Sequence, residues 1–197
     1  MLLRWFRSVL FIVGTVCLGY AAFLTAESRI AQRYESVKFN EALAAPAPPL
    51  RAVGPQDPVG KIDIPSAGIS AIVLEGDDDR TLNRGPGHIP GTALPGGAGN
   101  VGVAAHRDTF FRGLEKLHKG DNIQFETLGG VYEYTVGSME VVTPDRSDVL
   151  ASSGSPMLTL VTCYPFHFIG PAPMRFIVHA RLVEGPASET TPPERMR

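Results

Sequence analysis

The stretch that decides the fold is Met157-Leu158-Thr159-Leu160-Val161-Thr162-Cys163-Tyr164-Pro165-Phe166. Residues 158–162 have the β-branched and apolar composition of a buried strand. Pro165 has no backbone N–H to donate to a strand ladder, so the strand is expected to end near Cys163. The thiol then stands on a rigid element beside a loop, which suits a nucleophile. The alternative is a small buried side chain, because free cysteines are among the most buried residues.

An uncharged apolar run, S-V-L-F-I-V-G-T-V-C-L-G-Y-A-A-F-L-T, occupies residues 8–25. A helix of this length rises about 27 Å, which is enough to cross the hydrocarbon core of a membrane. Arg4 and Arg7 precede the run, so the positive-inside rule places the N-terminus in the cytoplasm and the remainder outside. We favour an uncleaved signal-anchor over a cleaved signal peptide, because the small residues near its end make a poor cleavage site.

The two cysteines are expected to lie in different environments. Cys17 falls inside the expected membrane helix, whereas Cys163 falls outside the membrane, so the two cannot pair. Exported thiols are normally oxidised to disulfides. A single accessible cysteine in an exported domain therefore favours a reactive thiol over a structural one.

The sequence divides into four segments: a cytoplasmic stub with the transmembrane signal-anchor (1–25), a stalk and Pro/Ala-rich linker (26–58), a folded domain (59–184) and a tail (185–197). Within the second segment, residues 27–40 are helix-compatible and residues 41–58 have the composition of an extended spacer. The polar, Pro-containing tail is expected to be disordered. The net charge of −2 gives no argument for a nucleic-acid partner.

The folded segment is predicted to be mostly β. Strands are expected at residues 59–64, 69–74, 101–105, 122–127, 131–142, 158–163 and 174–183. Short helices or helical turns are expected at residues 77–83, 109–119 and 145–152. Thr109 is the expected N-cap of the second of these. About eight strands without regular strand–helix alternation predict a mostly antiparallel β-barrel or sandwich.

A cysteine nucleophile needs a base or a cation nearby. His106 ends the apolar strand at residues 101–105 as Cys163 ends its own strand. If the two strands lie in one sheet and run the same way, both side chains emerge at the same rim; the alternative is a histidine that caps a carbonyl. His167 lies in a Pro/Gly loop and is interpreted as a loop or substrate-wall residue. The remaining histidines are interpreted as solvated or structural: His88, His118 and His179.

Acyl chemistry also needs a donor for the oxyanion. Arg175 begins the strand that follows Cys163, after a Pro-rich loop that lets the chain return beside the first strand. A fixed guanidinium near the thiol could donate to an oxyanion or orient a substrate carbonyl. The alternative is an ion pair between Arg175 and a surface acid.

These separated motifs, taken together, resemble the sortase family over residues 59–183. T-L-V-T-C is similar to the sortase T-L-x-T-C signature, with Cys163 as the nucleophile, and Arg175 matches the third catalytic residue of the family. N-V-G-V-A-A-H-R-D-T-F-F-R-G-L resembles the catalytic-histidine region, which places His106 in that role. G-P-G-H-I-P-G-T-A-L-P-G and C-Y-P-F are most like the class D branch. One departure is Ala105, where relatives often have Gly.

The resemblance implies a membrane-anchored cysteine transpeptidase on a sortase-type eight-stranded β-barrel with a few short helices, preceded by a single transmembrane helix. The Cys163 thiolate would attack the Thr carbonyl of an LPXTG- or LPXTA-like sorting motif. The acyl group would pass to an amine of a peptidoglycan precursor or a protein lysine, or to water. Residues expected beside the substrate are Thr162, Ala105 and His167. The resemblance implies no cofactor. It implies a single-pass protein of the bacterial cell membrane with an extracytoplasmic catalytic domain.

Two other classes of function remain open on the residues alone: another extracytoplasmic Cys/His peptidase or hydrolase, and a noncatalytic β-domain that binds ligands at the cell surface. A papain-like C-G-S-C-W segment is absent, and L,D-transpeptidases place Gly where Thr162 precedes the cysteine. Scattered Cys and His lack metal-ligand spacing, so no metal site is expected. Asp77-Asp78-Asp79 could hold Ca²⁺, although a solvated acidic turn is the favoured interpretation.

Overall fold

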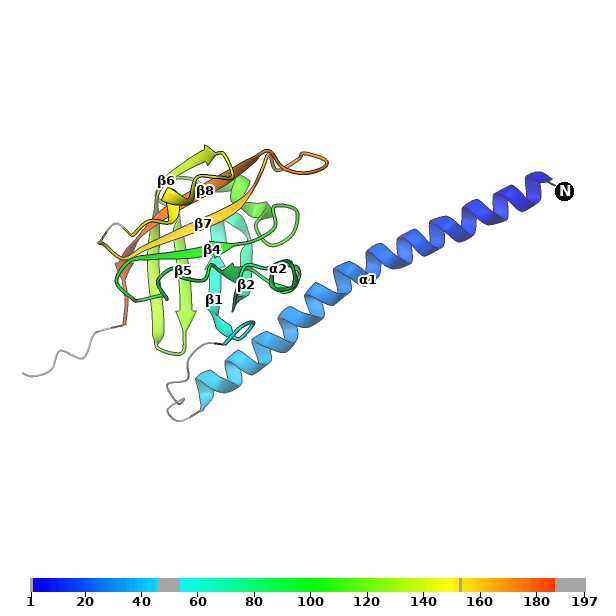
Figure 1. The fold of residues 1–197 in the computed structure, drawn as a ribbon. Helices are drawn as coiled ribbons and strands as arrows, with labels where there is room; N and C mark the ends of the chain where they lie inside the picture. Colours follow the sequence, from blue (N-terminus) through cyan, green and yellow to red (C-terminus); the bar gives the residue numbers. More distant parts are fainter. Residues whose placement is uncertain (1, 46–53, 153, 187–197) are drawn as a thin grey trace, which may run out of the picture.

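The computed structural model describes residues 2–45, 54–152 and 154–186 (Figure 1). Eight strands close a barrel in the order β1-β2-β3-β4-β7-β8-β6-β5. Their bounds are Pro58–Ile64 (β1), Ile69–Glu75 (β2), Gly87–His88 (β3), Asn100–Ala104 (β4), Asn122–Thr127 (β5), Gly130–Val142 (β6), Met157–Tyr164 (β7) and Met174–Glu184 (β8). The β2–β3 and β4–β7 pairs are parallel and the other pairs are antiparallel. The predicted mostly antiparallel eight-stranded barrel is confirmed.

Within these described ranges there are two α-helices and three 3₁₀ turns: Leu2–Ala44 (α1), Asp79–Arg84 (α2), Pro65–Ala67 (η1), Arg112–Lys116 (η2) and Ser147–Leu150 (η3). Residues 46–53 of the predicted linker and residues 187–197 of the predicted tail lie outside the described residues.

The barrel interior is filled by side chains that alternate along the strands. On β7, Leu158 and Leu160 are fully buried in the main core, together with Val103 of β4 and Val178 of β8. Alternation along a strand sends Thr159, Val161 and Cys163 to the opposite, outer face. The outer face of β7 therefore carries Cys163, and the inner face holds the strand in position.

The short helix predicted at residues 109–119 is shorter than expected and is of the 3₁₀ type. The chain forms only the short 3₁₀ turn η2, and Thr109 is not its N-cap, because that position belongs to Phe111, without a side-chain cap. Phe111, Leu114 and Leu117 are all buried, a spacing of three that matches the three residues per turn of a 3₁₀ helix. Close packing of Gly113 against the backbone of Ala67 also leaves no room for a side chain there.

The first helix, α1, runs unbroken from the N-terminal apolar run through residue 44, beyond the end of the predicted stalk at residue 40. Residues 41–44, Glu-Ala-Leu-Ala, are strong helix formers, and Pro46 in the sequence disfavours continuation. An 18-residue window of this helix has a mean hydropathy of 2.1 and is not buried in the protein. By length and composition the helix can cross a membrane, as expected of a signal-anchor.

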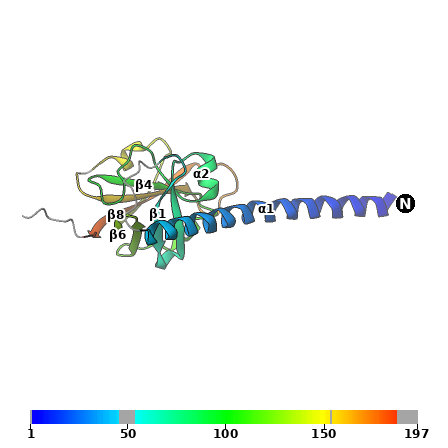
Figure 2. The ribbon, with the colours of Figure 1, turned by 90° about the horizontal axis from the view of Figure 1, so that it is seen from below.

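The C-terminal half of α1 lies against the barrel beside β2 and α2, while its N-terminal half projects away (Figures 1 and 2). Gln32 makes the most specific contact. Its Nε2 donates to the carbonyls of Ile72 (3.1 Å) and Arg84 (2.9 Å), and its Oε1 accepts from the backbone N–H of Ile72 (2.8 Å). The partner strand β3 pairs only with Leu74 and Glu75, so the Gln32 amide satisfies the β2 edge where β3 is absent.

Two further contacts fix the docked helix. The carboxylate of Glu35, 4% exposed, accepts a hydrogen bond from Arg84 Nη2 at 2.7 Å. One turn further on, Phe39 is buried in a small cluster with Ile72 and Leu74. The stalk is therefore packed on the domain, a feature that the sequence analysis did not predict.

Replacing Gln32 with Ala should release the helix from the β2 edge. The lost bonds leave the Ile72 amide without its partner, which costs about 1–3 kcal/mol of local stability. Hydrogen exchange of the Ile72 amide should accelerate by about tenfold or more. The control is Gln124→Ala at an exposed position of β5. Unchanged exchange at Ile72 in Gln32→Ala would contradict the docking described above.

Candidate active site

Cys163 lies one residue from the end of β7 on the outer face of the barrel, and its side chain is half-buried. The strand β8 runs antiparallel to β7, and the register places Arg175 directly opposite Cys163. Paired residues on neighbouring strands project to the same face. The guanidinium and the thiol are therefore brought to one side of the sheet, as predicted for these two residues.

His106 follows β4, the other neighbour of β7. The two strands are parallel, with Ala104 opposite Val161, and the backbone N–H of Ala105 donates to the carbonyl of Val161 at 3.1 Å. Continued by two residues, this register sets His106 level with Cys163. The two strands do lie in one sheet and run the same way, which is the condition set from the sequence for a common rim. We call His106, Cys163 and Arg175 the catalytic row, after the roles expected for them from the sequence.

Thr162 joins the two strands directly before the catalytic row. Its Oγ1 donates to the carbonyl of Ala105 at 2.7 Å, and the two residues are 2% and 5% exposed. Each is the chain neighbour of a row residue, Cys163 or His106. The structure thus places Thr162 and Ala105 beneath the row rather than on its exposed side.

Arg175 is partly buried and directs Nη1 at backbone carbonyls, those of Met174 (3.0 Å) and Ala172 (3.4 Å). A guanidinium has five N–H donors, so these bonds leave several donors for a ligand. Neither bond is to a carboxylate, in contrast to the surface ion pair considered from the sequence. The backbone bonds hold the side chain near its own strand, on the outer face beside the thiol.

The loop between β7 and β8 is tied to the chain that follows His106. Arg107 Nη2 donates to the carbonyls of Phe168 (2.8 Å) and Gly170 (2.9 Å) in this loop. His167 projects from the same loop with a side chain 72% exposed, and its Nε2 lies 2.8 Å from Glu115 Oε2. Arg107 was missed by sequence reasoning, although its position next to the candidate histidine was a usable signal.

Further along the same outer face, two loops cover β4: the first connects β3 to β4, and the second connects β6 to β7. A Cβ on Gly102 would lie 3.0 Å from Thr92, 3.1 Å from Leu150 and 3.2 Å from Ile89, so only glycine fits without displacement. Ala104 and Val161, which lie between Gly102 and the catalytic row, stay partly exposed. They form an apolar strip that leads to Cys163, which we call the floor strip.

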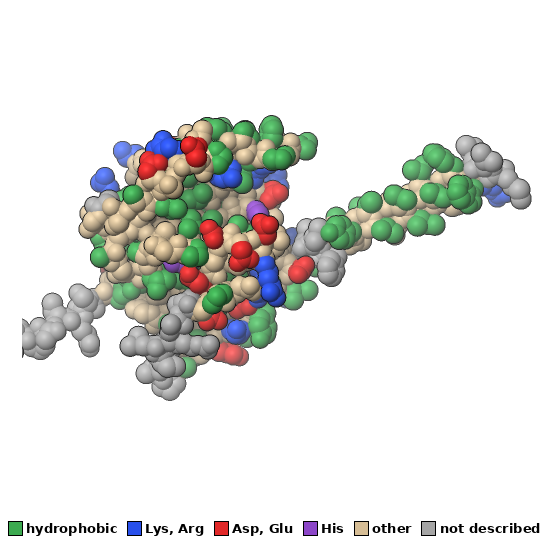
Figure 3. Space-filling view, in the orientation of Figure 1, with side chains coloured by type: hydrophobic (Ala, Val, Ile, Leu, Met, Phe, Trp, Pro, Cys, Tyr) green, Lys and Arg blue, Asp and Glu red, His purple; other side chains and the backbone are tan. Residues whose placement is uncertain are grey.

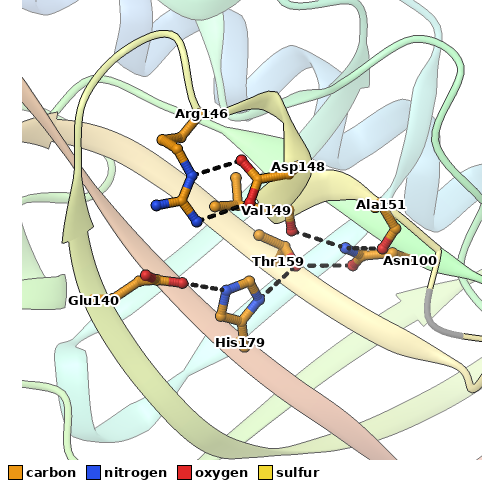
Figure 4. Close-up of polar contacts among 8 residues, drawn as sticks. All are labelled: Asn100, Glu140, Arg146, Asp148, Val149, Ala151, Thr159 and His179. Atoms are coloured by element: carbon orange, nitrogen blue, oxygen red, sulfur yellow. Dashed lines mark hydrogen bonds and ion pairs between the residues drawn. The ribbon is translucent and has the colours of Figure 1, made fainter.

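A polar network fixes the second of these loops to the sheet (Figure 4). Asn100 Nδ2 donates to the carbonyls of Val149 (3.2 Å) and Ala151 (3.5 Å), and its Oδ1 accepts from Thr159 Oγ1 at 2.8 Å. The hydroxyl proton of Thr159 is thereby used, so His179 Nδ1 donates to Thr159 Oγ1 at 3.1 Å. His179 belongs to a structural network, as predicted.

The first loop, between β3 and β4, is held in place by a buried histidine. His88, 2% exposed, places Nδ1 2.7 Å from Glu75 Oε2 and Nε2 3.0 Å from both the Ala93 carbonyl and Thr92 Oγ1. The Thr92 hydroxyl donates to the Ile89 carbonyl at 2.7 Å, so it can only accept from His88. His88 is therefore structural and anchors the loop between β3 and β4.

Within the acidic run at residues 77–79, Asp78 has a structural role at the start of α2. Asp78 caps this helix, because its side chain accepts from the backbone N–H groups of Arg80 (2.9 Å) and Thr81 (3.2 Å). A further hydrogen bond from the Thr81 hydroxyl is the main cause that lowers the pKa of the Asp78 carboxyl. Among the described residues, no group of three His, Cys, Asp or Glu side chains could hold a metal ion.

Comparison with known proteins gives a consistent result. The sortase domain family matches residues 62–183. The chain is 31% identical over 125 residues to Sortase D of Bacillus subtilis, which covers 63% of each chain, so it spans just under two thirds of that relative. It is 27% identical over 176 residues to Sortase A of Bacillus anthracis, covering 79% of this chain and 83% of the relative.

Among solved structures, a sortase D5 transpeptidase of Clostridium perfringens superposes with a TM-score of 0.71 at 28% identity. The match covers 78% of this chain and 99% of the other. The sortase A structure of Listeria monocytogenes matches with a TM-score of 0.60 at 26% identity, over 65% of this chain and 88% of the other. Because the domain match extends over more than half of the sequence and the barrel agrees with it, this chain belongs to the sortase family.

Proposed function

We propose that this protein is a membrane-anchored sortase that cleaves an LPXTG- or LPXTA-like sorting motif after its threonine and transfers the acyl group to an amine. The observation that carries the proposal is the catalytic row. The parallel β4–β7 register and the antiparallel β7–β8 register align a histidine, a cysteine and an arginine on one outer face. Nucleophile, acid–base group and oxyanion donor are the three parts that cysteine acyl transfer needs.

In the first half of the reaction, the Cys163 thiolate attacks the carbonyl carbon of the substrate threonine and forms a C–S bond. Arg175 donates to the carbonyl oxygen as it gains negative charge. The tetrahedral intermediate collapses, the peptide C–N bond breaks, and protonated His106 gives its proton to the departing amine. A thioester on Cys163 and a neutral His106 remain.

The floor strip supports a substrate that lies extended along the outer face. Ala104 and Val161 offer apolar surface beside Cys163, and the two loops anchored by His88 and Asn100 flank the path. A sorting motif has a leucine and a proline before its scissile threonine, and both side chains favour an apolar surface. The peptide would thus approach the thiol from the covered end of β4.

The membrane helix supports retention of the enzyme at the surface where its substrates emerge. The apolar run is the N-terminal part of α1, and Gln32 and Glu35 pack the C-terminal part of the same helix on the domain. An uncleaved signal-anchor would therefore hold the catalytic domain outside the cytoplasm and close to the bilayer. The partners would be proteins that carry the sorting signal, with an amine of a peptidoglycan precursor or a protein lysine as acceptor.

The reaction is tested by incubating the full-length protein in detergent with LPXTG and LPXTA peptides and an amine. Mass spectrometry should show a thioester on Cys163 and the transpeptidation product. Cys163→Ala should form no acyl-enzyme, and His106→Ala should lower turnover by at least about a hundredfold, the usual contribution of general acid–base catalysis. Both variants should keep the wild-type melting temperature within a few degrees. Cleavage by Cys163→Ala would disprove the mechanism.

Arg175→Lys should lower kcat/KM by about a hundredfold, because a point charge does not reproduce the planar fork that donates to an oxyanion. The matched control is Arg181→Lys, at an exposed position of the same strand far from the catalytic row. Peptide cleavage followed by chromatography measures both. Near-normal turnover by Arg175→Lys would assign this residue a structural role.

Thr162→Val should loosen the join between the two strands that carry the catalytic row. The Ala105 carbonyl loses its buried donor, which should lower the free energy of unfolding by about 1–3 kcal/mol. Thr162→Ser keeps the hydroxyl and is the matched control. The pH profile of Cys163 alkylation by iodoacetamide should shift in the Val variant and not in the Ser variant. Identical profiles in both would show that Thr162 does not position the row.

A further inference from the structure

A hollow of about 500 Å³ is lined in part by His106, whereas Cys163 is not among its lining residues. Its walls come from three separate segments: Glu27 of the stalk helix, Arg80 and Arg84 of α2, and His106 with the chain after it. His106 follows β4, which lies between β3 and β7 in the strand order β2-β3-β4-β7. The helix α2 connects β2 to β3, whereas Cys163 lies on β7, so α2 and Cys163 belong to strands on opposite sides of β4. We call this hollow the stalk pocket.

The stalk helix is a fixed wall of this pocket. Gln32 and Glu35 dock the helix onto β2 and α2, only one to two turns beyond Glu27. A Cβ on Gly85 would lie 2.4 Å from Gln32 Nε2, so the chain leaves no space for a side chain between helix and domain. The apolar run ends at residue 25, which sets Glu27 about 3 Å further along the helix axis. The stalk pocket therefore opens close to the membrane surface.

The pocket presents one carboxylate and one guanidinium that are not in ion pairs. Arg84 is neutralised by Glu35 at 2.7 Å. Glu27 and Arg80 are both exposed, and the ion pairs found within 4.0 Å in the described part of the chain include neither of them. Figure 3 shows acidic and basic side chains together on the barrel surface where α1 meets it. A ligand with one positive and one negative group matches this pair better than a simple cation does.

We propose that the stalk pocket binds the acceptor, an amine whose carbon also carries a carboxylate, with Glu27 receiving the ammonium and Arg80 the carboxylate. This inference rests on the proposed function, because only an acyl-enzyme needs an acceptor. The sorting peptide occupies the floor strip on the β7 side of His106. The acceptor therefore reaches the same base from the β3 side, and the two substrates do not compete for space.

The transfer step balances with these groups. The bound ammonium first releases one proton to solvent, which leaves a neutral amine. The neutral amine then leaves Glu27 and reaches past His106 to the thioester carbonyl. Its nitrogen attacks, a C–N bond forms, and neutral His106 takes one proton from the nitrogen. The C–S bond then breaks and its electron pair returns to Cys163. The thiolate and the protonated histidine that began the reaction are restored.

The test measures acceptor use separately from acylation, with the full-length protein in detergent. Single-turnover thioester formation on Cys163 is measured without an amine. It tests the proposed acylation step and does not depend on the acceptor pocket. Glycine and glycinamide are then compared as acceptors, since they differ only in the carboxylate. Wild-type protein should have a kcat/KM at least about tenfold higher for glycine, the loss expected when one charge-assisted hydrogen bond is missing. Intrinsic reactivity works against this result, because glycinamide has more free amine at neutral pH.

Glu27→Gln should lower kcat/KM by about tenfold for both amines, and Arg80→Gln should lower it for glycine only. Both variants should form the thioester at the wild-type rate. The matched controls are Glu41→Gln, at an exposed position further along the stalk helix, and Arg181→Gln. The proposal is overturned if Glu27→Gln and Arg80→Gln use glycine as wild type does, or if wild type uses both amines equally. Absence of a thioester in wild type would instead reject the proposed function.

Discussion

The parallel pairing of β4 with β7 is the constraint on which the candidate site depends. It sets the ends of two strands from distant parts of the sequence at the same rim, and the Thr162 hydroxyl joins them through the Ala105 carbonyl at 2.7 Å. Parallel strands need a long connection, and here the connection contains β5 and β6. Two further barrel strands therefore lie between the histidine and the cysteine in the sequence. The two side chains come together only when β7 pairs with β4 in the closed barrel.

The two faces of β7 have different roles: the inner face packs in the core, and the outer face carries the candidate nucleophile. Leu158 and Leu160 lock the strand into the core, while Val161 and Cys163 face outward. A slip of the register by one residue would bury the thiol and expose the leucines, at a cost of several kcal/mol of lost apolar burial. The same burial that stabilises the barrel thus fixes which residues can react.

Local sequence patterns predicted the strands and the order of the motifs, because β-branched runs bounded by Gly and Pro are local signals. The pairing of Cys163 with Arg175 also followed from a short return loop. The two-residue strand β3 carried no periodic signal, and the 3₁₀ turn η2 depends on close packing of Gly113 against another segment. Docking of Gln32 onto Ile72 joins residues 40 positions apart through a side-chain amide, a contact that no local pattern encodes.

That docking changes what the stalk does. A flexible linker after a membrane helix would let the domain turn freely, whereas α1 is continuous to residue 44 and is bound to the domain before it ends. The ion pair of buried Glu35 with partly buried Arg84 also fixes the orientation of the helix, because a buried carboxylate is tolerated only with its partner in place. If α1 crosses a bilayer, helix geometry then sets how the rim that carries Cys163 is oriented relative to it. The proposed transfer would gain from this, since the rim would already be oriented before either substrate arrives.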